Sequence, residues 1–106
     1  MAISNTLVTT TPTAVYTVPS GQEFAVTTMF FCNYSGSDVT LSSLNLVPSG
    51  GTASDTNRII KDLLVPAGET LTFDSEKIIL GSQDFISAVA SDNSRLNVTF
   101  CTLQVS

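Results

Sequence analysis

The sequence predicts an all-β fold, an antiparallel β-sandwich of about eight strands. The motif Val-Pro-small residue-Gly occurs three times, at residues 18–21, 47–50 and 65–68. In a tight turn Pro sets φ at the first corner position, and Gly accepts the positive φ that closes the turn. Each copy lies between short segments rich in Val, Thr, Phe, Leu and Ile, which is typical of a sandwich or barrel. Both jelly-roll and immunoglobulin-like connectivities stay open.

The length of 106 residues suits one domain. We expect residues 13–106 to form a single β-sandwich domain. Residues 1–12 form an N-terminal segment, either a peripheral strand or a contact arm. Within it, residues 7–10 have a strand composition and precede Pro12.

The next two segments differ in how they alternate. Residues 14–18 place Ala, Tyr and Val on one face, as in a half-buried strand. Residues 23–34 are the most apolar segment and carry large side chains on both faces. We therefore expect a central strand that is covered on both sides, with Met29 and Phe31 on one face. The second cover comes either from loops or from another subunit.

The middle of the chain contains one phase change and one ambiguous segment. In residues 39–47 the apolar alternation slips across Ser42 and Ser43, which predicts a β-bulge. Residues 59–65 fit either a strand or a short helical turn, because their apolar residues also fall on helical spacing. The surrounding rhythm favours a strand.

The last part of the chain adds four more expected strands. In the final one, the apolar residues change phase between Phe100 and Leu103, which predicts a second bulge. The four segments are residues 70–73, 77–80, 85–90 and 95–105.

The charge balance disfavours two classes of partner. The net charge is −5, and only four residues are Lys or Arg. Nucleic acids and anionic membranes require a clustered basic surface, so we expect neither as a partner. Charged residues are 12% of the chain. Charged residues normally keep sheet edges from pairing with other chains. A sheet with so few of them is either a Thr-rich exposed face or a surface covered in an assembly.

The N-terminus lacks the basic region and long apolar stretch of a secretory signal. We therefore expect synthesis in the cytoplasm without export.

Cys32 and Cys101 each fall within an expected strand. Reduced thiols in the core are the favoured interpretation, since free Cys is a common small buried residue. A disulfide is the alternative, as in immunoglobulin domains, although the chain has no Trp to pack on it. Two isolated Cys do not make a metal-ligand set.

No catalytic motif is visible. The chain contains no His, the commonest general base and metal ligand. Its nine acidic residues stand singly, mostly in expected turns, where carboxylates usually cap backbone N–H groups. We predict a protein that is not an enzyme and has no catalytic residues, cofactor or metal.

Contact residues are expected in three places. The longest loop has no packing role that its own residues reveal, so it is either a contact loop or a flexible connection. The other two places are the N-terminal segment and the face of the most apolar strand. The candidate residues are Ile3, Leu7, Met29, Phe31, Ser49, Gly51, Thr52, Asp55 and Asn57.

Several motifs together carry a resemblance to a known family. They are Thr13-Ala-Val-Tyr-Thr-Val-Pro-Ser-Gly21, Cys32-Asn-Tyr-Ser-Gly36, Leu46-Val-Pro-Ser-Gly-Gly51 and Val65-Pro-Ala-Gly-Glu-Thr-Leu71. The chain resembles small β-sandwich virion structural proteins of tailed bacteriophages, notably those of cyanobacterial hosts. The similarity extends over residues 11–105, and its motifs are turn signatures.

The resemblance implies a virion structural role without an active site. The function it favours is a capsid decoration (cement) subunit that bridges and stabilises major capsid proteins. The implied partners are the major capsid protein or other virion proteins. The resemblance also implies a homo-oligomer, with a trimer as one option, and location in the virion. The alternatives are a tail, baseplate or fibre-associated accessory protein, or a host-glycan-binding β-sandwich module.

Overall fold

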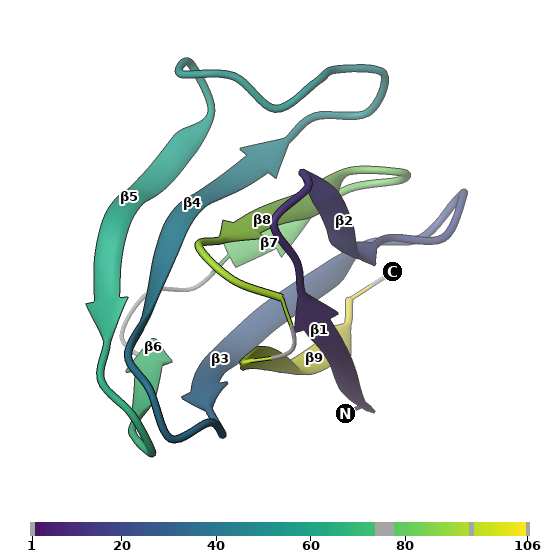
Figure 1. Cartoon of the computed structure of the whole chain (residues 1–106). Coiled ribbons are helices and arrows are strands. Elements are labelled where there is room, and N and C mark those ends of the chain that lie inside the picture. Colours follow the sequence, from purple (N-terminus) through teal and green to yellow (C-terminus); the bar gives the residue numbers. More distant parts are fainter. Residues whose placement is uncertain (1, 74–77, 94, 106) are drawn as a thin grey trace.

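The computed structural model describes residues 2–73, 78–93 and 95–105, which form two antiparallel sheets packed face to face (Figure 1). Sheet 1 has the strand order β1-β9-β3-β6, with β7 also paired to β3; sheet 2 has the order β2-β8-β4-β5. The expected all-β antiparallel sandwich is confirmed. The strands are β1 (Ala2–Val8), β2 (Thr13–Thr17), β3 (Phe24–Asn33), β4 (Val39–Val47), β5 (Arg58–Val65), β6 (Thr70–Phe73), β7 (Ile78–Leu80), β8 (Phe85–Ala90) and β9 (Leu96–Gln104).

The strand pairing is that of a jelly roll. β1 pairs with β9, β2 with β8, β3 with β6 and β7, and β4 with β5, so the pairs are nested inside one another. The chain is therefore one long antiparallel hairpin whose tip is the β4–β5 connection. Rolling this hairpin up places β9 beside β3 and β8 beside β4, which completes the two sheets.

The first strand differs from expectation. The sequence predicted a strand at residues 7–10, whereas β1 spans Ala2–Val8 and pairs with β9 along its whole length. The N-terminal segment is thus an edge strand of sheet 1. The expected start of a strand at Lys77 lies outside the described residues.

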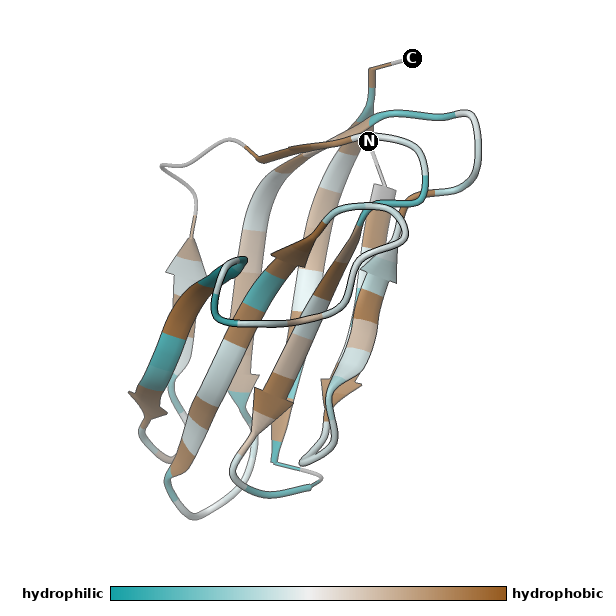
Figure 2. Ribbon diagram, turned by 90° about the horizontal axis from the view of Figure 1, so that it is seen from above, coloured by the Kyte–Doolittle hydropathy of each residue, from teal (hydrophilic) through white to brown (hydrophobic). Residues whose placement is uncertain are grey.

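Alternation along the strands builds the core between the sheets, as the brown and pale bands of Figure 2 show. Tyr16 of sheet 2 packs on Phe100 of sheet 1 at a ring-centroid distance of 5.5 Å. Phe31 and Phe73 pack edge to face at 5.7 Å. The largest fully buried side chains come from both sheets and include Phe31, Phe100, Leu41, Leu44, Ile86 and Leu96.

The three Val-Pro turns are present, with one correction to their geometry. Gly21, Gly50 and Gly68 have φ values of 80°, 79° and 74°. In each turn the Pro carbonyl accepts a hydrogen bond from the backbone N–H three residues later, at 2.9–3.3 Å. Pro therefore stands one position before the first corner, which is occupied by Ser or Ala. Positive φ at the second corner makes these type II turns, which require Gly there.

One predicted bulge is confirmed and the other is wrong. The register of β4 against β8 shifts between Leu41 and Ser43, as the phase slip at Ser42 predicted. β9 has no shift against β1. The irregularity lies instead in β3, between Val26 and Thr28. Leu103 breaks the apolar phase of β9 because its side chain is exposed, not because the strand bulges.

The ambiguous segment 59–65 belongs to strand β5. Asp62 in its middle has φ 53°, a left-handed conformation that is uncommon for a non-Gly residue. β5 is an edge of sheet 2, where such a local distortion breaks no second ladder.

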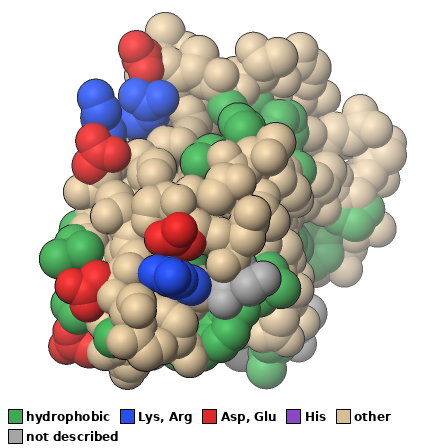
Figure 3. Space-filling model, viewed as in Figure 1, with side chains coloured by type: hydrophobic (Ala, Val, Ile, Leu, Met, Phe, Trp, Pro, Cys, Tyr) green, Lys and Arg blue, Asp and Glu red, His purple; other side chains and the backbone are tan. Residues whose placement is uncertain are grey.

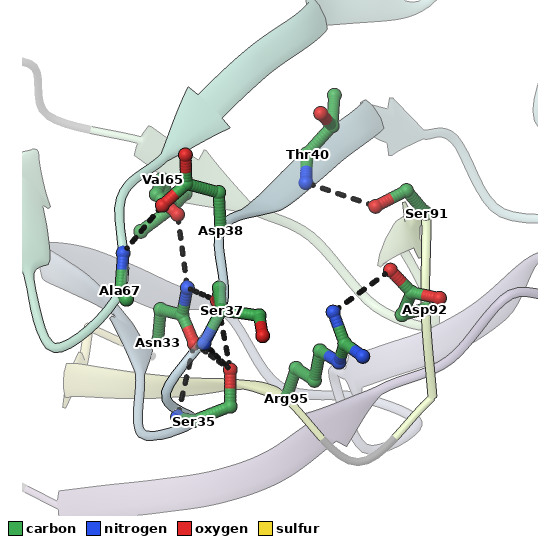
Figure 4. A network of polar contacts seen from close by, with 10 residues as sticks. All are labelled: Asn33, Ser35, Ser37, Asp38, Thr40, Val65, Ala67, Ser91, Asp92 and Arg95. Carbon is green, nitrogen blue, oxygen red and sulfur yellow. Dashed lines mark hydrogen bonds and ion pairs between the residues drawn. The ribbon is translucent and has the colours of Figure 1, made fainter.

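Asn33, at the end of β3, joins two turns at one end of the sandwich (Figure 4). Its side chain is fully buried. The amide nitrogen donates to the carbonyls of Ser37 at 2.8 Å and Val65 at 2.9 Å. The amide oxygen accepts from Ser35, from its backbone N–H at 3.0 Å and its hydroxyl at 2.7 Å. Asn33 thereby joins the β3–β4 turn to the end of β5.

The substitution Asn33→Ala is expected to lower the free energy of unfolding by about 1–3 kcal/mol, because it leaves buried carbonyl groups without donors. Urea unfolding followed by circular dichroism measures this change. Asn93→Ala is the matched control: the Asn93 side chain is exposed and accepts one bond, from Thr10 N at 3.0 Å. Its expected effect is below about 0.5 kcal/mol. Equal losses in the two variants would contradict the role of Asn33.

Candidate functional site

Among the described residues, the outward-facing positions of sheet 1 carry no charge. From Leu96 to Thr102 the inward positions of β9 are buried, whereas the alternate positions are partly or fully exposed. The paired strands β1 and β3 repeat this pattern. We call this surface the uncharged face. Its residues are Ile3, Asn5 and Leu7 of β1; Asn97, Thr99, Cys101 and Leu103 of β9; Ala25, Thr28, Phe30 and Cys32 of β3; Thr70 and Thr72 of β6; and Ile79 of β7.

Large apolar side chains on this face are open to solvent. Ile3 is 70% exposed and Ile79 is 68% exposed, although they lie on opposite edges of sheet 1. Between them, Leu103 is 44% exposed, and Phe30 is half-buried in the middle of the face. Scattered surface Leu or Ile residues are ordinary, but several on one uncharged sheet face mark a contact surface.

A cross-strand row made mostly of polar residues crosses the uncharged face from β1 to β6. Asn5 of β1 donates to the Thr99 hydroxyl at 2.8 Å. Thr99 is directly opposite Phe30, which is in turn opposite Thr72. Thr and Asn side chains keep the face hydrated although it carries no charge. A partner can therefore cover the face without the cost of desolvating charged groups.

A shallow hollow of about 360 Å³ lies at the β1 side of the uncharged face. None of its lining residues is aromatic or charged. They are Asn5, Thr6, Leu7, Asn97 and Thr99. Amide and hydroxyl groups here offer hydrogen bonds to a partner but no group that moves protons.

The outer side of sheet 2 is different because the long loop folds back over it. Asn45 and Val47 point away from the core, yet they are only 2% and 1% exposed. The amide nitrogen of Asn45 donates to Ser54 O and to Asn57 Oδ1, both at 2.8 Å. Asn57 also donates to Thr52 O at 2.9 Å, which holds the loop in one shape.

The predicted contact residues are divided between these two sides. Ile3 and Leu7 lie on the uncharged face. Ser49, Gly51, Thr52 and Asp55 are exposed in the long loop, and Asn57 is half-buried and organises it. The loop therefore has a packing role that its sequence did not reveal.

The prediction that Met29 and Phe31 make contacts is wrong. They are 3% and 0% exposed because they belong to the core. The bulge at Thr27 reverses the phase of β3, so that Val26 before it and Phe31 after it both face inward. Phe30 therefore faces outward, a result that alternation alone could not reveal because both faces of this strand carry large side chains.

The charged residues of the described strands are all on β5 of sheet 2, away from the uncharged face. In Figure 3 the Lys, Arg, Asp and Glu side chains gather mainly on the side of β5, at the left of the view. Arg58 pairs with Asp55 at 2.6 Å, and Arg95 pairs with Asp92 at 3.4 Å. Both are surface pairs and contribute little to stability.

The cysteines are free, half-buried and outside the core, on the uncharged face. The expectation of core thiols is therefore wrong in its placement. A bridge between them does not fit the register either, because Cys101 is opposite Thr28, four residues from Cys32. That separation is about 13 Å along a strand, against a disulfide Cα–Cα limit of about 6.8 Å.

Neither a metal centre nor a membrane helix is found in the described part of the chain. No three His, Cys, Asp or Glu residues gather there in a way that could hold a metal ion. Within the same residues, no helix has the length and apolar character needed to cross a membrane.

Comparison of the chain with protein families, with curated proteins and with solved structures found no match.

Cys32 and Cys101 are both expected to react with a thiol reagent in the folded protein, because neither is fully buried. The non-reduced intact mass is expected to equal the mass with two thiols. Cys101→Ser is expected to leave the reactivity of Cys32 unchanged. A non-reduced mass lower by two hydrogens would contradict the strand register given above.

Proposed function

We propose that this protein is a structural subunit of a bacteriophage virion, a capsid decoration subunit that binds major capsid proteins through the uncharged face. The observation that carries the proposal is this face itself, an exposed apolar surface without a charged group. Permanent interfaces are apolar at their centre and depleted of charged residues. The face therefore has the composition of an interface and not that of an ordinary solvated sheet.

The fold is compatible with this role. Jelly rolls occur in viral capsid and lectin domains, but the same fold serves unrelated functions. Of these two roles, capsid and lectin, the resemblance to small phage virion proteins supports the capsid role. The hollow at Asn5, Leu7 and Asn97 is lined by no aromatic side chain on which a sugar ring could stack, so it does not favour a glycan-binding module.

The proposed mechanism is stabilisation of the shell by bridging. A subunit that covers neighbouring capsid proteins binds the assembled shell and not its separated parts. Such binding stabilises the assembled state by RT ln(1 + [L]/Kd). Burying the uncharged face carries no free-energy cost for desolvating charged groups, because none of its residues is charged. Its apolar area therefore contributes to binding without that cost.

Introducing charge onto the face tests the proposal. The double substitution Ile79→Lys, Leu103→Lys is expected to weaken binding to the shell by more than about tenfold, because each Lys would be buried unpaired. Leu64→Lys is the matched control: Leu64 is 52% exposed and lies on the outer side of sheet 2, opposite Thr40. Particles assembled without the chain are mixed with each purified variant, and bound copies are counted by cryo-microscopy.

Density on the capsid shell for the wild-type chain and the control, with loss for the double variant, supports the proposal. Density on the tail or baseplate would overturn the decoration role in favour of a tail accessory. Undiminished binding of the double variant would overturn the assignment of the uncharged face.

A further inference from the structure

Strand β1 is an unprotected sheet edge. It pairs with β9 on one side, and residues 2–8 make no other backbone hydrogen bond to the described residues. Its contacts with sheet 2 are made by side chains: Val8 is buried in the shared core, and the Thr6 hydroxyl donates to Val15 O at 3.1 Å. Its seven residues include no charge and no Pro. Such an edge is a template for pairing with another chain.

The other described edges are protected in known ways. β5 carries Arg58, Lys61 and Asp62, and Asp62 distorts the strand with its positive φ. β2 has five residues and a register shift between Ala14 and Tyr16. β6 and β7 have only four and three residues. β1 is thus the one long edge among the described strands without a charge, a bulge or a Pro, which are the usual devices against pairing.

We propose that β1 pairs antiparallel with β1 of a second copy of this chain about a two-fold axis, which joins the two copies of sheet 1 into one continuous sheet. This inference does not rest on the proposed function. The absence of charge on β1 offers nothing to attract a charged partner and nothing to repel an identical strand. A two-fold interface places the same residues on both sides, so the edge must be complementary to itself.

The side chains of β1 select one register. Partners across an antiparallel pair lie on the same face, so the axis must pass through a residue and not between two residues. With the axis at Asn5, Ile3 is opposite Leu7 of the second copy, and Leu7 is opposite Ile3. All seven residues of β1 then have a partner. With the axis at Ser4 or Thr6, one of the two exposed apolar residues is opposite Asn5 and the other has no partner on β1.

The size of this interface predicts a reversible dimer. An antiparallel pairing of seven residues makes about six to eight backbone hydrogen bonds. Its area is below the roughly 800 Å² per partner of a standard stable interface. We therefore expect a monomer–dimer equilibrium that shifts with protein concentration, and not a permanent dimer.

A charge-pairing experiment tests the edge and the register together. The double substitution Ile3→Lys, Leu7→Lys places like charges opposite each other twice and is expected to give a monomer at every concentration. The double substitution Ile3→Glu, Leu7→Lys places opposite charges across the axis and is expected to restore the dimer. Within one chain the two positions are about 13 Å apart, so repulsion inside the monomer does not explain the difference. Sedimentation equilibrium measures the association, and circular dichroism verifies the fold.

A cross-linking experiment keeps the edge almost intact. In a Cys32→Ser, Cys101→Ser background, Asn5→Cys is expected to form a disulfide-linked dimer on mild oxidation. At the axis the two Cα atoms are about 4.5–5.5 Å apart, within disulfide range. Ile59→Cys on the protected edge β5 is the matched control, and we expect little cross-linking from it.

Three results of these two experiments would contradict the pairing of β1 with a second copy. Wild-type chain that stays monomeric at high concentration, or equal association of the two charged variants, would overturn the β1 pairing. Equal cross-linking of Asn5→Cys and Ile59→Cys would overturn it as well. None of these results bears on binding of the uncharged face to a shell, which the Ile79 and Leu103 substitutions test.

Discussion

The structure depends on the burial of one side of each sheet against the other. Nested pairing brings the two ends of the chain together as β1 and β9 and places the tip of the hairpin on the other sheet. Every strand then has an inner side set by the shared core, and its outer side is free to differ. The fully buried Asn33 shows how strongly this arrangement constrains polar groups, because its side chain finds partners in the β3–β4 turn and at the end of β5.

The two outer sides have become very different surfaces. Sheet 2 is covered in part by its own long loop, through Asn45 and Asn57, and its free edge β5 carries charges. Sheet 1 has neither a covering loop nor a charged edge among its described strands. Within the described strands, charged residues are therefore found on β5 of sheet 2 and not on sheet 1. The uncharged face consists mostly of Thr, Asn and aliphatic side chains, a composition suited to contact with protein.

The two proposals meet at β1, whose outward side chains Ile3, Asn5 and Leu7 belong to the uncharged face. Binding to a shell involves side chains across the whole face, whereas self-pairing involves the backbone edge of β1, with Ile3 and Leu7 setting its register. An extended sheet made from two copies would double the area of the uncharged face without covering it. The half-buried cysteines lie within this face, so their accessibility reports on whether the face is covered.

Local chemistry in the sequence was sufficient for the all-β class, the three glycine turns, the bulge at Ser42 and nearly all strand positions, because each of these depends on residues close in the chain. The tertiary structure alone decided the jelly-roll connectivity, since pairing of β1 with β9 joins residues almost a full chain apart. It also decided which side of β3 is buried: large side chains occupy both sides, and only the unpaired residue Thr27 reverses their phase. For the same reason, the exposed Phe30, the buried Phe31 and the packing of the long loop followed from contacts that no local pattern specifies.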